Sequence, residues 1–299
     1  MSTRQVECSV IVLTLNEERN IGACLESLAG FDDLHVLDSG STDATLRIAA
    51  RCGAASAFNP FTSFGQQRNW GHDHLPLRSR WVLHLDADER MTARLAVEIA
   101  AVLAADDGTL AGYHVAERTL LRGGWLRHSG QYPRYQARLV HRDRMRFVDH
   151  GHGQRESSGL PFGTLKNPYD HLAFSHGLEH WLRKHAGYAT REAAQILSST
   201  AAGEGSLMAH LFSGNAMQRR RALKQLAMHM PMRPLLRFLH ILIVNRGILD
   251  GRAGWEYARM MRVFQEMIDL ALAEARNEAT SGAVHPMRLE GADIAESKR

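Results

Sequence analysis

The chain has 299 residues, of which 44% are hydrophobic and 23% are charged. These ordinary globular values exclude general disorder and suit one domain of about 200–250 residues with an appendage, or two smaller domains. The net charge of +4, from 36 basic and 32 acidic residues, is too small to indicate a class of partner until the basic residues are located.

The expected location is the cytoplasm. The three cysteines, Cys8, Cys24 and Cys52, form no CxxC pair, which is typical of reduced thiols. The first residues lack the apolar core and the cleavage site of a secretory signal. The most apolar C-terminal stretch, residues 238–245, is far shorter than the roughly 20 residues that a membrane-spanning helix needs.

The first hundred residues alternate between strand and helix patterns. Short apolar runs rich in β-branched residues predict strands at 8–15, 34–38, 54–58 and 81–85. Helices are expected after Asn16, from Ser41 to about Cys52, around 66–74 and over 91–104, with Asn16 and Ser41 as N-caps. This alternation predicts an α/β fold with a mostly parallel sheet and helices on both faces.

The rest of the chain changes pattern. Residues 113–147 have shorter, alternating runs that predict mixed-sheet strands and loops. Helices are then expected at 178–199, 215–229, 235–246 and 252–276. We assign residues 1–200 to an α/β domain, 201–276 to a basic helical appendage and 277–299 to a loose tail.

A polar segment, Asp38-Ser39-Gly40-Ser41-Thr42-Asp43, follows the second predicted strand. Ligands of open α/β sheets bind beyond the carboxyl ends of strands, where a carboxylate can accept from a ribose hydroxyl or a base N–H. The glycine lets the backbone approach closely, and a helix N-terminus presents N–H groups to an anion. The same residue types also form ordinary turns, so this segment alone leaves a ligand site and a structural turn equally open.

A second acidic segment, Asp86-Ala87-Asp88-Glu89, follows the apolar run 81–85. Two carboxylates one residue apart repel each other unless a cation or a hydrogen-bond donor compensates them. Mg²⁺ is commonly held by one or two carboxylates together with substrate phosphates. Because the segment follows a buried strand of the same sheet, we favour a metal and phosphate site over a solvated acidic turn.

The first strand ends in Thr14-Leu15-Asn16-Glu17-Glu18. No GxGxxG follows this strand, which disfavours a Rossmann dinucleotide site, and no Walker GxxxxGK[ST] occurs in the chain.

Four segments together resemble the family-2 glycosyltransferases of the GT-A fold. They are TLNEERNI, DSGSTDAT, FGQQRNWG and WVLHLDADER. More narrowly, they resemble the branch of lipopolysaccharide-core and exopolysaccharide β-glucosyltransferases of Gram-negative bacteria, over about residues 6–200. The resemblance implies a Rossmann-like, mostly parallel sheet. It also implies an inverting, metal-dependent transfer of a hexose, with glucose as first choice, from a UDP-sugar to a saccharide or lipid-linked acceptor in cell-envelope polysaccharide synthesis. UDP-galactose and GDP-sugars stay open as donors.

The resemblance also implies roles for residues at matching positions. Those expected at the nucleotide are Thr14, Asn16, Glu17, Asp38, Arg68 and Asp86. Of these, Asp38 would contact the base or the ribose, and Asp86 would lie near the ribose and the metal. Asp88 would be the direct ligand of a Mg²⁺ or Mn²⁺ ion that bridges the diphosphate.

The catalytic base is expected in residues 147–156, which read FVDHGHGQRE where relatives carry a compact valine-histidine-glutamate. Glu156 is the first candidate and Asp149 the second, because a carboxylate must deprotonate the acceptor hydroxyl. The alternative is a zinc site drawn from Asp149, His150, His152, His171 and His176. With 17 histidines in the chain, neighbours arise by chance, so we favour an acceptor-side position for His150 or His152.

Basic residues concentrate in the C-terminal third. Residues 215–262 contain ten Lys or Arg against two acidic residues, and between 231 and 249 the cations alternate with apolar residues at helical spacing. Such a helix suits an anionic membrane surface, so we favour peripheral contact with the inner face of the cell membrane. The alternative is packing of its apolar stripe on the α/β domain. Nucleic acid is not expected, since no recognisable binding motif accompanies the cations.

Two other functions compete with glycosyl transfer. A sugar nucleotidyltransferase normally needs a glycine-rich loop with Arg or Lys after the first strand, where this chain has TLNEERN. A catalytically silent nucleotide-sugar-binding scaffold is disfavoured by the intact Asp86-Ala87-Asp88.

Overall fold

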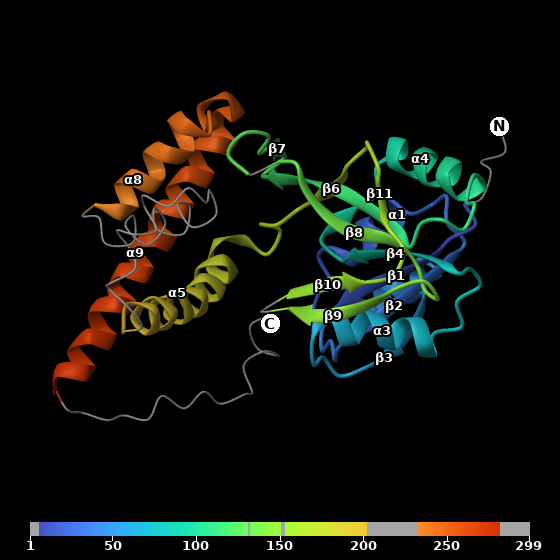
Figure 1. The fold of residues 1–299 in the computed structure, drawn as a ribbon, viewed down its shortest axis with the longest axis horizontal. Coiled ribbons are helices and arrows are strands. Elements are labelled where there is room, and N and C mark those ends of the chain that lie inside the picture. The colour runs from blue at the N-terminus through green and yellow to red at the C-terminus, as the bar shows by residue number, and fades with distance from the viewer. Residues whose placement is uncertain (1–5, 131, 151–152, 202–231, 282–299) are drawn as a thin grey trace. The chain divides into compact units, whose positions relative to one another are not determined.

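The computed structural model describes residues 6–130, 132–150, 153–201 and 232–281 (Figure 1). These residues form two compact units. The N-terminal unit contains residues up to 127 and 131–175, and the C-terminal unit contains 128–130 together with the described residues from 176 onward. The boundary placed at residue 200 from the sequence differs from this division, because the helix that begins at residue 177 packs with the C-terminal helices.

The N-terminal unit is built on one mixed sheet. Its first half is parallel, in the order β3 (Ala55–Phe58), β2 (Asp33–Asp38), β1 (Ser9–Thr14) and β4 (Trp81–Asp86). All four strands were predicted, because each is a short apolar run between polar turns. Every residue of β1 is buried, as expected for a strand covered on both faces.

The second half of the sheet continues with two long strands, β6 (Gly112–Leu121) and β8 (Arg134–His141), and several short ones. The order beyond β4 is β8, β6, β12 (Tyr169–His171) and β5 (Glu89–Arg90), while β7 (Gly124–Trp125) and β11 (Phe162–Thr164) pair with β6. The pairings of β8 are antiparallel, and β12 and β11 run parallel to β6. A separate antiparallel ribbon joins β9 (Arg146–His150) to β10 (Gly153–Ser157).

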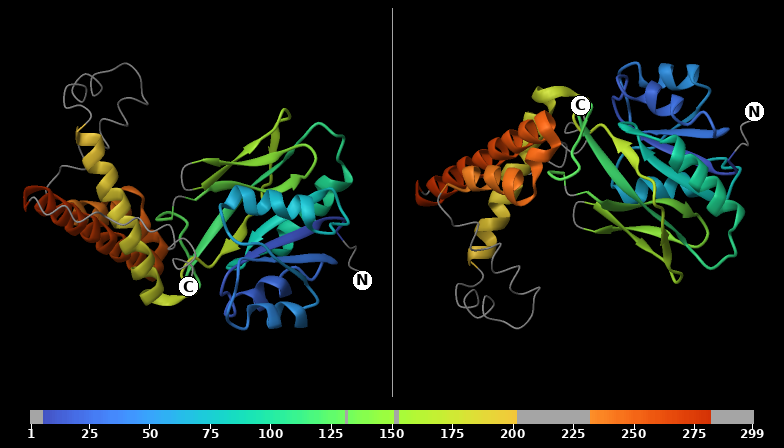
Figure 2. Two further views of the ribbon diagram at one scale, coloured as in Figure 1. Left: turned by 90° about the horizontal axis from the view of Figure 1, so that it is seen from below. Right: turned by 90° about the horizontal axis from the view of Figure 1, so that it is seen from above.

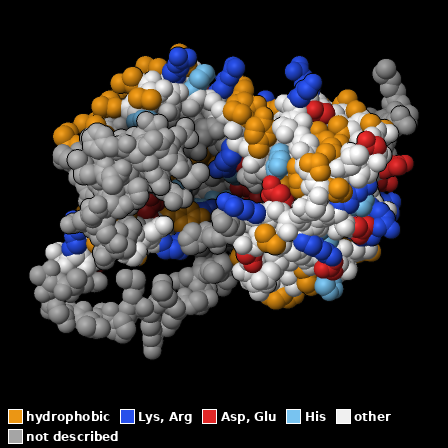
Figure 3. Space-filling view, in the orientation of Figure 1, with side chains coloured by type: hydrophobic (Ala, Val, Ile, Leu, Met, Phe, Trp, Pro, Cys, Tyr) orange, Lys and Arg blue, Asp and Glu red, His pale blue; other side chains and the backbone are white. Residues whose placement is uncertain are grey.

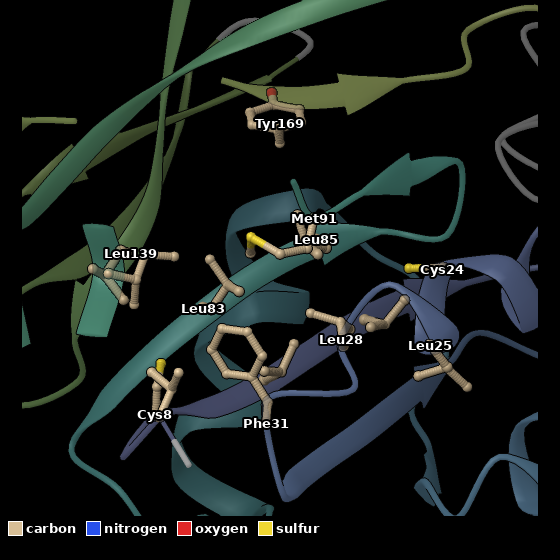
Figure 4. Close-up of a cluster of buried hydrophobic side chains, with 14 of the residues drawn as sticks. Cys8, Cys24, Leu25, Leu28, Phe31, Leu83, Leu85, Met91, Leu139 and Tyr169 are labelled. Atoms are coloured by element: carbon tan, nitrogen blue, oxygen red, sulfur yellow. The ribbon is translucent and has the colours of Figure 1, made fainter. Parts of the chain in front are cut away.

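Helices cover both faces of this sheet (Figure 2). One face packs on α1 (Ile21–Glu26), α2 (Thr45–Arg51) and α4 (Ala93–Ala104) through a core that includes Cys8, Cys24 and Phe31, part of which is drawn in Figure 4. The other face packs on α3 (Phe64–His74) and on Phe147 of β9. Complete burial of one such aliphatic or aromatic side chain contributes about 1.5–3 kcal/mol. The expected α/β class, a mostly parallel sheet with helices on both faces, is therefore confirmed.

The C-terminal unit is helical, as predicted. Its long helices α5 (Gly177–Ala201) and α9 (Gly251–Ser281) pack together through Ala189, Ala193, Ile196, Ile268 and Leu272. Along the chain between these two helices come α8 (Arg233–Leu239), the π-helix η2 (His240–Val244) and the 3₁₀-helix η3 (Gly247–Asp250). The helix predicted at 215–229 and most of the predicted tail lie outside the described residues. Among the residues that the structure describes, no helix is long and apolar enough to cross a membrane.

Candidate functional site

The carboxyl ends of β1, β2 and β4 bring together three of the residues selected from the sequence. Thr14 lies opposite Asp38 in the parallel register, and Asp86 lies opposite the residue before Thr14. Parallel strands end at one edge of a sheet, which is where open α/β sheets bind ligands. The register thus places the TLNEE, DSGSTD and DAD segments at one edge.

The turn after β2 is organised around the carboxylate of Asp38, which is only 2% exposed. One of its oxygens accepts from the Thr14 hydroxyl at 3.0 Å, and the other accepts from the backbone N–H groups of Gly40 and Ser41 at 2.9 and 2.8 Å. Gly40 has a φ of 111°, a conformation that glycine adopts without steric cost. Both oxygens of Asp38 therefore shape the loop against which a ligand would lie.

The loop after β1 is tied to the same turn by reciprocal hydrogen bonds. The Asn16 N–H donates to the Ser41 hydroxyl, and the Thr42 N–H donates to the Asn16 side chain, both at 2.8 Å. The Glu17 N–H donates to the Thr45 hydroxyl at 2.8 Å.

These loop contacts correct the predicted helix caps. The helices begin later than expected, at Ile21 and Thr45, because Asn16 and Ser41 link the two loops to each other. Asn16 also has a left-handed φ of 54°, which a helix N-cap does not adopt.

Arg68 lies beside Asp86. Its guanidinium is buried, and it donates to Asp86 at 3.1 Å and to the Gln154 side chain at 3.1 Å. The rings of Phe64 and Phe147 lie 6.0 and 5.8 Å from its central carbon. Arg68 is thus held rigidly at the end of β4, where its charge can act on an anion.

A second buried arginine, Arg138, was not selected from the sequence. Arg138 of β8 donates to the other oxygen of Asp86 at 3.3 Å and forms an ion pair with Glu89, and both side chains of that pair are 2% exposed. The sequence held a signal for it, because Arg138 interrupts the apolar run Ala-Arg-Leu-Val, where an inward charge needs a partner. Asp86 is therefore clamped between two arginines.

Asp88, two residues beyond the end of β4, lies beside His171. The His171 Nε2 is 3.3 Å from the Asp88 carboxylate, and its Nδ1 is 2.7 Å from the carboxylate of Glu117 on β6. Burial opposes protonation of His171, but its two carboxylate partners raise its pKa to about 10. Glu117 is itself buried, yet its hydrogen bonds to His171 and Arg134 lower its pKa to about 2.

The two candidate bases lie on the β9–β10 ribbon. Asp149 pairs in register with Gln154, the residue that contacts Arg68, and its carboxylate is 3.4 Å from the Gln66 side chain. Glu156 is two residues further along β10, and its carboxylate is 2.6 Å from the His114 ring. Asp149 thus lies directly across the ribbon from Gln154, whereas Glu156 lies two residues, roughly 7 Å, beyond Gln154 on the same strand.

The structure gives the zinc alternative no support. Of its candidate ligands, His171 contacts Asp88 and Glu117, Asp149 contacts Gln66, and the ring of His176 lies against that of His180 within the C-terminal unit. The His150 side chain and His152 lie outside the described residues. In the described part of the chain, no group of three or more His, Cys, Asp or Glu side chains is arranged to hold a metal ion.

Comparisons with known proteins bear on the N-terminal unit. The family model described as "Glycosyl transferase family 2" matches residues 9–157. A lipopolysaccharide core biosynthesis glycosyltransferase, LpsC of Rhizobium meliloti, is 29% identical over 144 residues, which are 46% of this chain and 52% of the relative. An uncharacterised glycosyltransferase of Rickettsia conorii is 31% identical over 97 residues, 32% of this chain and 34% of the relative. The chain thus spans about half or less of the curated relatives that it matches.

Solved structures are similar over a comparable part. The glucosyl-3-phosphoglycerate synthase of Mycobacterium tuberculosis, solved with Mn²⁺, UDP and glucosyl-3-phosphoglycerate, is 25% identical. The match covers 43% of this chain and 47% of that chain, with a TM-score of 0.31.

Proposed function

The chain belongs to glycosyl transferase family 2 through residues 9–157, and from this premise we propose that it is an inverting hexosyltransferase. It would move a hexose, glucose as first choice, from a UDP-sugar to a saccharide or lipid-linked acceptor in cell-envelope polysaccharide synthesis. The observation that carries the proposal is the convergence of Asp38, Asp86 and Asp88 at one sheet edge, with Arg68 against Asp86. The proposal includes peripheral contact with the inner face of the cell membrane.

The donor would lie against the two cross-linked loops. Thr14, Asn16 and Glu17 would line the nucleotide pocket. Asp38 would fix the conformation of the loop whose backbone would contact the base and the ribose. Arg68 stays charged at any working pH because a guanidinium does not deprotonate in proteins. Its contact with Asp86 orients a carboxylate that would face the ribose.

The residues present fit a divalent cation. The Asp88 carboxylate is 25% exposed, and Mg²⁺ or Mn²⁺ would rely on it and on donor phosphates. The adjacent His171 is kept protonated by its two carboxylate partners, so it would join as a ligand only on losing its Nε2 proton to the incoming metal. Glu117 accepts from His171 Nδ1 and so directs Nε2 toward Asp88, as carboxylates do behind metal-binding histidines. A bound cation would offset the negative charge that develops on the departing nucleoside diphosphate.

For the catalytic base we now place Asp149 ahead of Glu156. A base must come within hydrogen-bond reach of the acceptor hydroxyl, and Asp149 lies directly across the ribbon from Gln154, the residue that contacts Arg68. It would take the proton of the acceptor hydroxyl while the hydroxyl oxygen attacks the anomeric carbon from the face opposite the diphosphate.

The test is transfer from UDP-glucose, UDP-galactose and GDP-mannose to a saccharide acceptor, with the anomer of the product read by NMR. We expect one UDP-sugar to react with inversion. Retention of configuration would contradict the mechanism. Binding of a UDP-sugar without any transfer to a panel of envelope saccharides would favour the silent scaffold.

A further inference from the structure

The C-terminal unit exposes four aliphatic side chains in one short stretch. Ile243, Val244, Ile248 and Leu249, here called the apolar tip, are 68%, 67%, 66% and 66% exposed. They flank a turn in which Arg246 has a left-handed φ of 57° and separates η2 from η3. Ile241 and Leu242, by contrast, are buried in a cluster with Ala258 of α9. The local fold therefore buries one pair of aliphatics and leaves the tip in water.

The exposed apolar surface continues along α8. Leu236 and Leu239 are three residues apart, which places them on one face of α8, and they are 41% and 39% exposed. Met232, just before the helix, is 66% exposed. Trp255 of α9 is 49% exposed and packs edge-on against Phe238, at 5.2 Å between ring centroids. Figure 3 shows orange side chains gathered over the segment labelled α8 in Figure 1. Single exposed apolar residues are common on protein surfaces, whereas a contiguous exposed apolar patch marks an interaction site.

Basic side chains outnumber acidic ones in residues 246–259, which hold three arginines and two acids. Arg246 and Arg259 are exposed, and the Arg252 side chain is 86% exposed. Both acidic side chains in this segment form hydrogen bonds or an ion pair. The Asp250 side chain is 2% exposed and accepts from the backbone N–H groups of His128 and Ser129, and Glu256 pairs with Arg252 at 2.8 Å. The tip is therefore apolar with a cationic rim.

We propose that the apolar tip inserts into the headgroup region of an anionic lipid bilayer, with the surrounding arginines on the lipid phosphates. Insertion would remove the four aliphatic side chains from water, and each basic residue close to an anionic surface adds to the attraction. The rim matches an anionic surface in charge, and arginine binds phosphate in a fixed two-point geometry. This inference rests on the proposed function for its purpose, since a lipid-linked acceptor lies at such a surface. Its test does not depend on transfer.

The test is co-sedimentation of the full-length protein with vesicles of phosphatidylcholine alone and of phosphatidylcholine mixed with phosphatidylglycerol. We expect binding to the mixed vesicles that weakens as salt is raised. The double variant Ile243→Ser/Ile248→Ser should bind at least about ten-fold more weakly. Arg246→Gln/Arg252→Gln should lose about five-fold for each charge. The matched control is Val97→Ser/Leu270→Ser, which removes two aliphatics that are each 71% exposed elsewhere and should bind like the wild type.

Three results would overturn the proposal. The wild type could bind neither kind of vesicle, or the tip variant could bind as well as the control. Light scattering could also show that the wild type is an oligomer that the tip variant turns into monomers, which would assign the tip to a second copy of this chain. Donor binding by the same variants should stay at the wild-type level, so loss of vesicle binding and failure of the glycosyltransferase proposal are read separately.

Discussion

Replacement of Arg138 by methionine isolates the buried charge network behind Asp86. Arg138 and Glu89 have side chains that are each 2% exposed, so the single variant leaves a buried carboxylate without its counter-charge. Removing one partner of a buried ion pair typically costs about 3–5 kcal/mol because it leaves an uncompensated buried charge, and neutralising the other partner as well removes that charge. We therefore expect Arg138→Met to lower the free energy of unfolding by roughly 3–5 kcal/mol. Arg138→Met/Glu89→Gln should regain most of that loss.

Urea unfolding followed by circular dichroism gives both values, by linear extrapolation to water. The matched control is Arg80→Met, because Arg80 pairs with Asp143 on the surface, with side chains 69% and 45% exposed. Exposed pairs contribute about 0–1 kcal/mol, so this variant should change little. The reasoning would be refuted by an Arg138→Met variant within about 1 kcal/mol of the wild type, or by a double variant no more stable than the single one.

Two further predictions concern stability at low pH and the base. Burial lowers the pKa of His72 to about 4 and holds that of His84 well below its usual range, so both rings are neutral when folded and take up protons on unfolding below about pH 6.5. The free energy of unfolding should thus fall as pH drops from 6.5 toward 4, by about 3 kcal/mol from His72 alone. The fall should be smaller in His72→Gln. Equal pH slopes of the free energy of unfolding in the two proteins would count against this. Asp149→Asn should lower kcat about 10²-fold or more with little change in donor affinity, and Glu156→Gln far less, as measured by initial rates. The opposite ranking would restore Glu156 as the base.

The sequence predicted the shared sheet edge of the strand-end segments because that edge is built from local patterns. Each of β1, β2 and β4 is an apolar run that ends in a polar segment, and parallel strands that follow one another along the chain end at the same edge. This places Thr14, Asp38 and Asp86 together without any knowledge of side-chain contacts.

The rest of the site depends on partners that are distant in the sequence. His171 meets Asp88 from 83 residues away and Glu117 from 54 residues away, and Arg138 meets Glu89 from 49 residues away. No local spacing encodes these pairs, because they follow from the order of β4, β8, β6 and β12 in the sheet. The prediction of helix caps at Asn16 and Ser41 was wrong for a related reason. Their side chains form hydrogen bonds to each other's loop and not to the first turn of a helix.

Calorimetric titration of UDP into the full-length protein, with Mn²⁺ and then with EDTA, tests the central claim most directly. The glycosyltransferase account predicts UDP binding that requires the metal, is lost in Asp88→Ala and weakens in Glu117→Gln, while GDP binds more weakly. Val97→Ser, a surface change on α4, serves as the control and should bind UDP like the wild type. If neither nucleotide binds with or without the metal, the edge formed by Asp38, Asp86 and Asp88 is not a donor site and the account is contradicted.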